Sequence, residues 1–169
     1  DANISPDEKL LLFIGNANPG YGLEELICSL PMLSENVHLA LLGYIPETYK
    51  NTIEELVSSL ELECRFHVLK PVEYKYVPEY ASGADIGVIG LQRNVLNMQL
   101  CLPNRFFDYV MARLPIASSR IPSIVEYMDR YDIGTYFDEN SPEDIARSIK
   151  ALLQEEKINE RHLIREEMA

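Results

Sequence analysis

The stretch LPNRFFDYVMARLPIASS, residues 102–119, decides how the chain is expected to fold. Its first half predicts a helix from about Arg105 to Ala112, with Asn104 as the N-cap. Four apolar residues recur at helical spacing and should form one buried face: Phe106, Phe107, Val110 and Met111. A short buried strand, Pro115 to Ala117, should follow. A helix that leads directly into a buried strand is typical of alternating α/β proteins.

The polar side of the same helix carries Arg105 and Asp108 close to its N-terminus. The free N–H groups and the positive pole of a helix N-terminus suit a phosphate. A carboxylate one turn deeper can accept hydrogen bonds from hydroxyl groups. We therefore expect this helix start to bind a ligand of the sugar-nucleotide type, with the loop from Arg93 to Pro103 folded over it.

Composition limits both the size and the partners of the protein. The chain has 169 residues, of which 47% are hydrophobic, enough for one domain with a full core and too few for two ordinary ones. Its formal net charge of −12 would repel nucleic acid and anionic membrane surfaces, so neither is expected as a partner. Any phosphate must then be bound by local contacts.

The three cysteines do not follow a metal-binding or disulfide pattern. Cys28, Cys64 and Cys101 are odd in number and widely spaced, so we expect buried free thiols and no metal site. No apolar run is long enough to form a transmembrane segment, and the acidic start is no signal peptide. These features predict a soluble, cytoplasmic protein. The absence of an initiator methionine suggests that the chain is cut from a longer one.

Strands and helices should alternate along the chain. Strands are expected at Lys9–Ile14, Val37–Leu42, Glu63–Leu69, Ala84–Ile89, Pro115–Ala117 and Thr135–Phe137. Further helices are expected from Leu23 to near Pro31, Glu47 to Leu60, Val77 to Ser82, and Ser123 to Tyr131 with Gly134 in the C-cap region. A last helix should be opened by Ser141 as its N-cap, with Pro142 at N1, and run to about Gln154. The charged remainder, Glu155 to Ala169, is helical by propensity and should need a neighbour.

This alternation predicts a single Rossmann-like, doubly wound α/β domain over residues 1–154, followed by a C-terminal helical tail over residues 155–169. The sheet should be mainly parallel, with about six strands and helices on both faces. In such sheets, ligands bind in the crevice beyond the carboxyl ends of the strands. The candidate binding residues all follow predicted strands or begin the helix after residue 103.

The same residues carry a family resemblance. PNRFFDYVMARLPIASSRIPSIVEY resembles the signature of the C-terminal, nucleotide-sugar-binding half of GT4-type (group 1) glycosyltransferases of the GT-B fold. The likeness continues in order through GNANPGYGLEEL, HLALLG, YASGADIGVIGL and FDENSPEDIARSIKALL, over roughly residues 9 to 154. An ordered set of matches is more specific than any one motif.

The resemblance implies a donor-binding domain of a retaining hexosyltransferase, with no cofactor and no metal ion. The donor would be a UDP- or GDP-sugar, and the acceptor would be a glycan or a lipid-linked acceptor. An N-terminal domain in the same polypeptide would supply the acceptor site, so this chain alone should bind and not catalyse. The missing domain could place the enzyme at the inner face of the membrane.

The resemblance also assigns the candidate site. The glycine loop from Gly15 to Gly22 would border the donor phosphates. The nucleobase would lie at the turn formed by Lys70, Pro71 and Val72, and the ribose hydroxyls would lie at Asp108. Further candidates come from the loop and the helix start: Asn16, Tyr21, Asn104 and Arg105.

This sequence departs from the family pattern in two places. Asn16 and Tyr21 stand where many members carry two basic residues that hold the diphosphate, and Leu100 stands near the place of a first family glutamate. Arg93 and Arg105 are the candidate cations that could replace the missing pair. Stabilising a departing diphosphate is the main electrostatic task in sugar transfer, so these departures bear on catalysis.

Simpler interpretations stay open for each residue. The glycines and the turn after residue 69 could serve only as tight turns. Asp108 could be a solvated carboxylate on the helix surface, and Arg93 could be a solvated charge. His38 and His67 are expected to line strand faces. Two other functions also stay open: a non-catalytic binding or scaffolding domain that lost the donor chemistry, and a flavodoxin-like receiver or nucleotide-binding domain unrelated to sugars.

Overall fold

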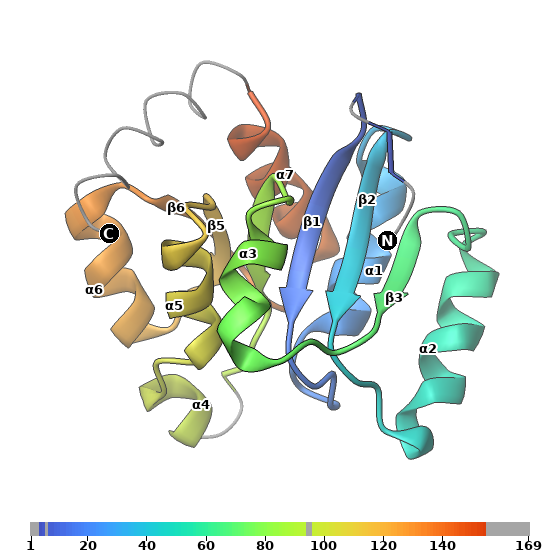
Figure 1. The fold of residues 1–169 in the computed structure, drawn as a ribbon, viewed down its shortest axis with the longest axis horizontal. Helices are drawn as coiled ribbons and strands as arrows, with labels where there is room; N and C mark the ends of the chain where they lie inside the picture. Colours follow the sequence, from blue (N-terminus) through green and yellow to red (C-terminus); the bar gives the residue numbers. More distant parts are fainter. Residues whose placement is uncertain (1–3, 6, 94–95, 155–169) are drawn as a thin grey trace.

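A computed structural model describes residues 4–5, 7–93 and 96–154. Six parallel strands form one sheet in the order β3-β2-β1-β4-β5-β6 (Figure 1). The strands are β1 (Lys9–Ile14), β2 (Val37–Leu42), β3 (Phe66–Leu69), β4 (Ile86–Ile89), β5 (Ile116–Ser119) and β6 (Gly134–Phe137). The predicted doubly wound α/β fold is confirmed, and so is each predicted strand, with β1 and β2 at the predicted bounds.

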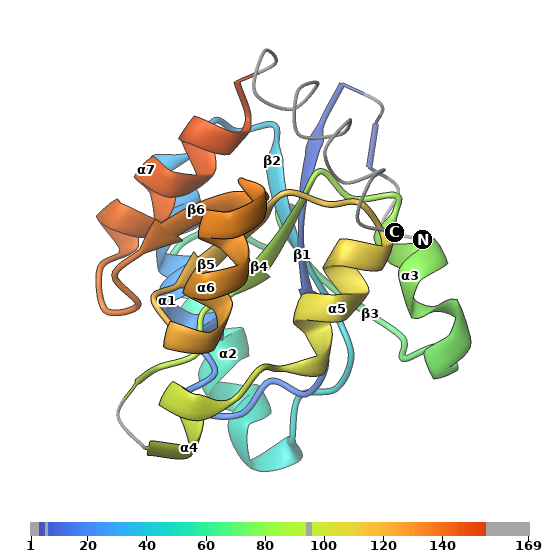
Figure 2. The ribbon, with the colours of Figure 1, turned by 90° about the vertical axis from the view of Figure 1, so that its left-hand side faces the viewer.

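Helices cover both faces of this sheet. One face carries α1 (Leu23–Ser29), α2 (Glu47–Ser59) and α7 (Pro142–Leu152), and the other carries α3 (Val77–Ala81), α5 (Asn104–Met111) and α6 (Pro122–Tyr131) (Figures 1 and 2). Two 3₁₀ turns are η1 (Leu30–Met32) and η2 (Tyr74–Tyr76), and α4 (Leu96–Leu100) lies near the carboxyl ends of the strands. The expected loop from Arg93 to Pro103 therefore contains a short helix that the sequence analysis missed.

Two predicted helix caps are wrong and one is confirmed. Pro103, not Asn104, is the N-cap of α5, and no side chain caps that end. Asp132 ends α6 in a left-handed conformation with φ of 45°, whereas Gly134 already belongs to β6. Ser141 caps α7 as predicted, since its hydroxyl accepts a hydrogen bond from the backbone N–H of Asp144 at 3.2 Å.

The predicted buried face of α5 is half wrong: Phe106 is buried and Val110 packs against the core, but the other two residues are not buried. Phe107 and Met111 are 45% and 63% exposed, while Arg105, Asp108 and Tyr109 are buried together with Phe106. The side chain of Tyr109 sets this rotation, because its ring lies against Gly87 of β4, where an added Cβ would stand 2.4 Å from the ring. The glycine leaves space for the ring, and the ring turns the polar side of α5 inward.

The Tyr109 hydroxyl joins β1 to β4 where the two strands separate. The strands pair through Leu11 with Ile86 and Leu12 with Gly87. Beyond that point the hydroxyl accepts from the backbone N–H of Ile14 at 3.1 Å and lies 2.8 and 3.1 Å from the carbonyl oxygens of Leu12 and Val88. A side chain from a helix thus replaces ladder hydrogen bonds between the two central strands.

The expectation of buried thiols is wrong for Cys64, which is exposed; Cys28 and Cys101 are partly buried, and all three are free. Cys64 is exposed because β3 begins at Phe66 and leaves it in the preceding turn. The predicted tail, Glu155 to Ala169, lies outside the described residues. No helix among residues 4–5, 7–93 and 96–154 has the length and hydrophobicity required to cross a membrane.

His38 and His67 lie side by side on the neighbouring strands β2 and β3. The rings stack with centroids 5.2 Å apart, and Nδ1 of His38 lies 2.9 Å from Nε2 of His67. The carboxylate of Glu8 lies 3.4 Å from Nε2 of His38. Burial lowers the pKa of His67 from its ordinary 6.5, His38 lowers it further, and Glu8 acts in the opposite direction. The pair is therefore most stable when His67 is neutral.

Replacing Tyr109 by phenylalanine should lower the free energy of unfolding by about 1–3 kcal/mol, because the buried N–H of Ile14 loses its acceptor. Urea denaturation measures the change. Tyr127→Phe on α6, where the side chain is more exposed, is the matched control and should change stability by less than about 0.5 kcal/mol. Equal effects of the two substitutions would contradict the role given to the Tyr109 hydroxyl.

Stability should fall as the pH drops below about 6.5, since the folded protein binds a proton at His67 less readily than the unfolded chain does. The His67→Gln variant should lose less stability than the wild type between about pH 7.5 and pH 5. Denaturant unfolding at both pH values measures the difference. Equal losses in the two proteins would show that this pair does not govern acid sensitivity.

Candidate functional site

A cavity of about 510 Å³ opens beyond the carboxyl ends of β1, β2 and β3, beside the N-terminus of α5. Most of the predicted site residues line it: Gly15, Asn16, Tyr21, Pro71, Val72, Asn104, Arg105 and Asp108. Gly22 and Lys70 adjoin lining residues in the chain and are not part of the wall. The fold thus brings together segments that are far apart in the sequence, at the edge where parallel sheets bind ligands.

The glycine loop has a structural reason for its glycines. Gly15 has a φ of 101°, a conformation that residues with a Cβ rarely adopt. Gly22 packs directly on Gly90 after β4, since an added Cβ would stand 2.0 Å from the Gly90 carbonyl oxygen. Tight turns therefore explain these glycines in part. The same turns bring the backbone to the cavity wall.

Arg105 is buried at the floor of this site. It is 8% exposed, and its guanidinium carbon lies 4.3 Å from the ring centroid of Phe13 and 5.8 Å from that of Tyr21. Its Nη1 is buried and has no hydrogen-bond partner among the described residues. Burial lowers the pKa of Arg105, yet a guanidinium stays charged at neutral pH. The site therefore holds a cation whose hydrogen-bonding capacity is not fully used.

The guanidinium of Arg105 also lies at the glycine turn. A Cβ added to Gly15 would stand 3.6 Å from Nη2 of Arg105. Arg105 is the second residue of α5, so its charge adds to the free N–H groups of that helix start. An anion placed there would meet a helix terminus, a glycine turn and a buried cation at once.

Asp108 lines the same cavity as Gly15 but is only 3% exposed. The interpretation of Asp108 as a solvated carboxylate is therefore wrong. Burial raises the pKa of Asp108, while a hydrogen bond from Tyr74 and the charge of Arg105 lower it in part. A buried carboxylate with few donors gains from a ligand that supplies hydroxyl groups.

The sequence analysis missed several wall residues. Tyr74, Val77 and Pro103 line the cavity, as do Ile14, Leu42 and Gly43 at the ends of β1 and β2. The sequence does predict where β1 and β2 end, so the wall residues at those strand ends could have been found from it. No local pattern, however, indicated that η2 would fold over α5.

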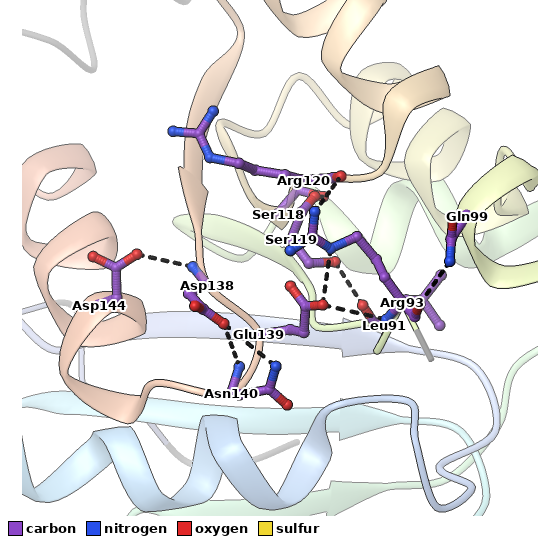
Figure 3. A network of polar contacts seen from close by, with 10 residues as sticks. All are labelled: Leu91, Arg93, Gln99, Ser118, Ser119, Arg120, Asp138, Glu139, Asn140 and Asp144. Carbon is purple, nitrogen blue, oxygen red and sulfur yellow. Dashed lines mark hydrogen bonds and ion pairs between the residues drawn. The ribbon is translucent and has the colours of Figure 1, made fainter. Parts of the chain in front are cut away.

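Arg93 does not line the cavity. Its Nε donates to Oε1 of Glu139 at 2.8 Å, at the end of the sheet near β6 (Figure 3). Arg93 is partly solvated, as the simpler interpretation expected, with its side chain 38% exposed, but its charge is paired with a carboxylate that is only 4% exposed. Of the two candidate cations, the structure brings Arg105 to the cavity and leaves Arg93 outside it.

Over the described ranges, no three or more His, Cys, Asp or Glu side chains gather closely enough to hold a metal ion. The chemistry visible at the cavity is that of charge and hydrogen bonding. It combines one buried cation, one buried carboxylate, backbone groups at two turns and an apolar wall.

Comparison with known proteins places this geometry in context. The family model described as glycosyl transferases group 1 matches residues 1–167. No curated protein matches the chain by sequence. Among solved structures, HepE of Anabaena in complex with UDP and glucose is similar with a TM-score of 0.79 and 14% identity, over 95% of this chain and 43% of that one.

Two further structures are similar. WaaG, a glycosyltransferase involved in lipopolysaccharide biosynthesis, has a TM-score of 0.74 and 19% identity, over 96% of this chain and 42% of its own. The C-terminal domain of the group 1 family protein LpcC from Francisella tularensis has a TM-score of 0.72 and 14% identity, over 94% and 80%. The chain thus spans less than half the length of HepE and WaaG.

Replacing Arg105 by methionine should raise the free energy of unfolding of the ligand-free chain by about 1 kcal/mol, because a buried charge without a full set of partners is removed. Inorganic pyrophosphate should raise the melting temperature of the wild type and not that of Arg105→Met. Thermal unfolding with and without pyrophosphate measures both effects. The exposed Arg130→Met is the matched control, and equal pyrophosphate stabilisation of all three proteins would contradict the assignment.

Proposed function

The chain belongs to the group 1 glycosyltransferases, and we propose on that basis that it is the donor-binding domain of an enzyme that transfers a sugar from a nucleotide-diphosphate sugar. The buried Arg105 guanidinium carries this proposal. It lies at a helix start beside a glycine turn, with Asp108 in the same cavity, and one of its nitrogens has no partner among the described residues. A sugar nucleotide offers the two groups that this pair lacks, a diphosphate and vicinal hydroxyls.

The proposed pose follows from the positions of the wall residues. The diphosphate would lie at Arg105 and the N–H groups of α5, next to Gly15. The ribose would give its hydroxyls to Asp108, and the base would lie along Pro71 and Val72. Uridine nucleotides are the favoured donors, because HepE of Anabaena binds UDP and UDP-glucose and the E. coli trehalose-6-phosphate structure holds UDP-2-fluoro glucose. GDP-sugars are the other donors to test.

In this proposal Arg105 does the main electrostatic work. Negative charge grows on the diphosphate as the bond to the sugar breaks, and a preorganised cation in a partly dry cavity stabilises that charge strongly. Asp108 and the apolar wall hold the nucleotide and so orient the bond to be broken. Arg105 would thus replace the basic pair that Asn16 and Tyr21 do not supply.

The remaining features of the enzyme are proposals as well. The chain spans 43% of HepE and 42% of WaaG, so an N-terminal domain would supply the site for a glycan or a lipid-linked acceptor. The isolated chain would bind the donor without completing transfer. Retention of configuration and independence from metal ions are expectations from the family. Peripheral attachment at the inner face of the membrane would come from the missing domain.

No specific observation favours the alternative of a non-catalytic scaffolding domain. A domain that had lost its donor would have no use for a buried, incompletely paired arginine, because such a group lowers stability. An apolar residue at position 105 would be expected instead.

Calorimetric titration with UDP, GDP and ADP tests the proposal directly. UDP should bind most tightly, with a dissociation constant in the range of about 1 μM to 1 mM. The absence of binding of any of the three at millimolar concentration would refute the donor-binding assignment.

Replacing Asp108 by asparagine should weaken UDP binding by about tenfold, or roughly 1.4 kcal/mol, because an amide offers one acceptor oxygen where the carboxylate offers two. The same variant should bind 2′-deoxy-UDP about as well as the wild type does. Titration with both nucleotides measures the difference. Glu54→Gln on the exposed side of α2 is the control, and a similar loss for both nucleotides would exclude Asp108 as the ribose acceptor.

A further inference from the structure

Glu139 is a buried carboxylate at the carboxyl end of the sheet, outside the cavity described above. It follows β6 and is 4% exposed. Its Oε1 accepts from Nε of Arg93 at 2.8 Å and from the Arg93 backbone N–H at 3.3 Å (Figure 3). Its Oε2 is buried and has no hydrogen-bond partner among the described residues. Arg93, which the Glu139 carboxylate thus holds by both side chain and backbone, belongs to the loop after β4, here residues 90–93.

Other contacts fix the same loop from the side of β5. Nη1 of Arg93 donates to the carbonyl oxygen of Arg120 at 3.4 Å, and the Ser119 hydroxyl donates to the carbonyl oxygen of Leu91 at 2.8 Å. Gln99 of α4 donates to the carbonyl oxygen of Arg93 at 2.9 Å. Figure 3 shows these groups converging on Arg93 from several elements. Residues 91–93 of this loop are therefore held in place by groups at the carboxyl ends of β5 and β6 and by Gln99 of α4.

The opposite side of this loop touches the glycine loop. The backbone N–H of Gln92 donates to the carbonyl oxygen of Gly20 at 3.0 Å, and its side-chain amide donates to Oε1 of Glu25 at 2.6 Å. Gly90 packs on Gly22 with no room for a Cβ between them. Tyr21 lies between Gly20 and Gly22 in the chain, and its ring faces the guanidinium of Arg105. A displacement of the loop after β4 would therefore move the wall around the buried cation.

We propose that Glu139 is a positioning residue for the diphosphate subsite, which it holds in place through Arg93, the loop after β4 and the glycine loop. This inference rests on the proposed function, because it assigns the Arg105 end of the cavity to the diphosphate. The base and ribose ends of the cavity are formed by the turn at Pro71 and Val72 and by Asp108 of α5, and none of the hydrogen bonds given above involves these residues.

The burial of Glu139 is consistent with a positioning role. A buried ion pair contributes little net stability, because desolvation offsets the attraction between the charges. What such a pair supplies is a defined geometry, here a carboxylate that holds the side chain and the backbone of one residue at the same time. A selective effect on one part of the ligand separates this role from general stabilisation.

The experiment compares UDP with uridine, which shares the base and the ribose but has no phosphates. In the 169-residue chain, Glu139→Ala should weaken UDP binding by about tenfold, equal to roughly 1.4 kcal/mol, and change uridine binding by less than about twofold. Glu139→Gln keeps an acceptor oxygen and should lose less than about threefold for UDP. Glu126→Gln, which removes a surface pair on α6, is the matched control and should change neither affinity.

A second variant keeps the test decisive if Glu139→Ala does not fold. Gln92→Ala removes the side-chain hydrogen bond to Glu25, leaves the backbone hydrogen bond to Gly20 in place, and should weaken UDP binding selectively but by less than Glu139→Ala does. Equal losses for UDP and uridine, or no loss for either, would overturn the positioning role while leaving donor binding intact. Failure of the wild type to bind UDP would instead refute the proposed function, and with it this inference.

Discussion

The Tyr109 hydroxyl between β1 and β4 is the contact on which the rest of the structure depends. The strand order reverses direction at this point of the sheet, and the two strands pair over a short stretch. Without a partner, the buried N–H of Ile14 would be left unsatisfied at the mouth of the crevice. Tyr109 supplies that partner, and its ring fills the space above Gly87. The separation of strands that opens a ligand site is thereby made compatible with a dry core.

This contact also determines where the polar groups of α5 lie. With Tyr109 fixed over the sheet, Arg105 one turn earlier and Asp108 beside it must face inward, against the cavity. Arg105 is buried with its Nη1 unpartnered among the described residues, and burial disfavours the charged form of Asp108, so both lower the stability of the empty protein. The tyrosine therefore contributes stability at the place where the candidate binding residues reduce it.

Local patterns in the sequence were enough to predict the strands, the parallel sheet and most of the cavity wall. Continuous apolar runs ended by glycine marked β1 and β2, and strand ends marked the site edge. The rotation of α5 could not be predicted, because it depends on a fit between Tyr109 and Gly87 across the fold. Tyr74 over Asp108 and Arg93 on Glu139 were missed for the same reason. Each is a contact between distant segments with no periodic signature.

The acidic composition gives the cavity a further property. A chain with a formal net charge of −12 repels polyanions at distances within the Debye length, about 8 Å at physiological ionic strength. A phosphate group can bind only where nearby donors outweigh that field, and Arg105 is a cation at the floor of the cavity, next to a helix start. Because the guanidinium is buried, salt screens it less than it screens the surface carboxylates. Attraction for a phosphate group is thus confined to a short range around Arg105.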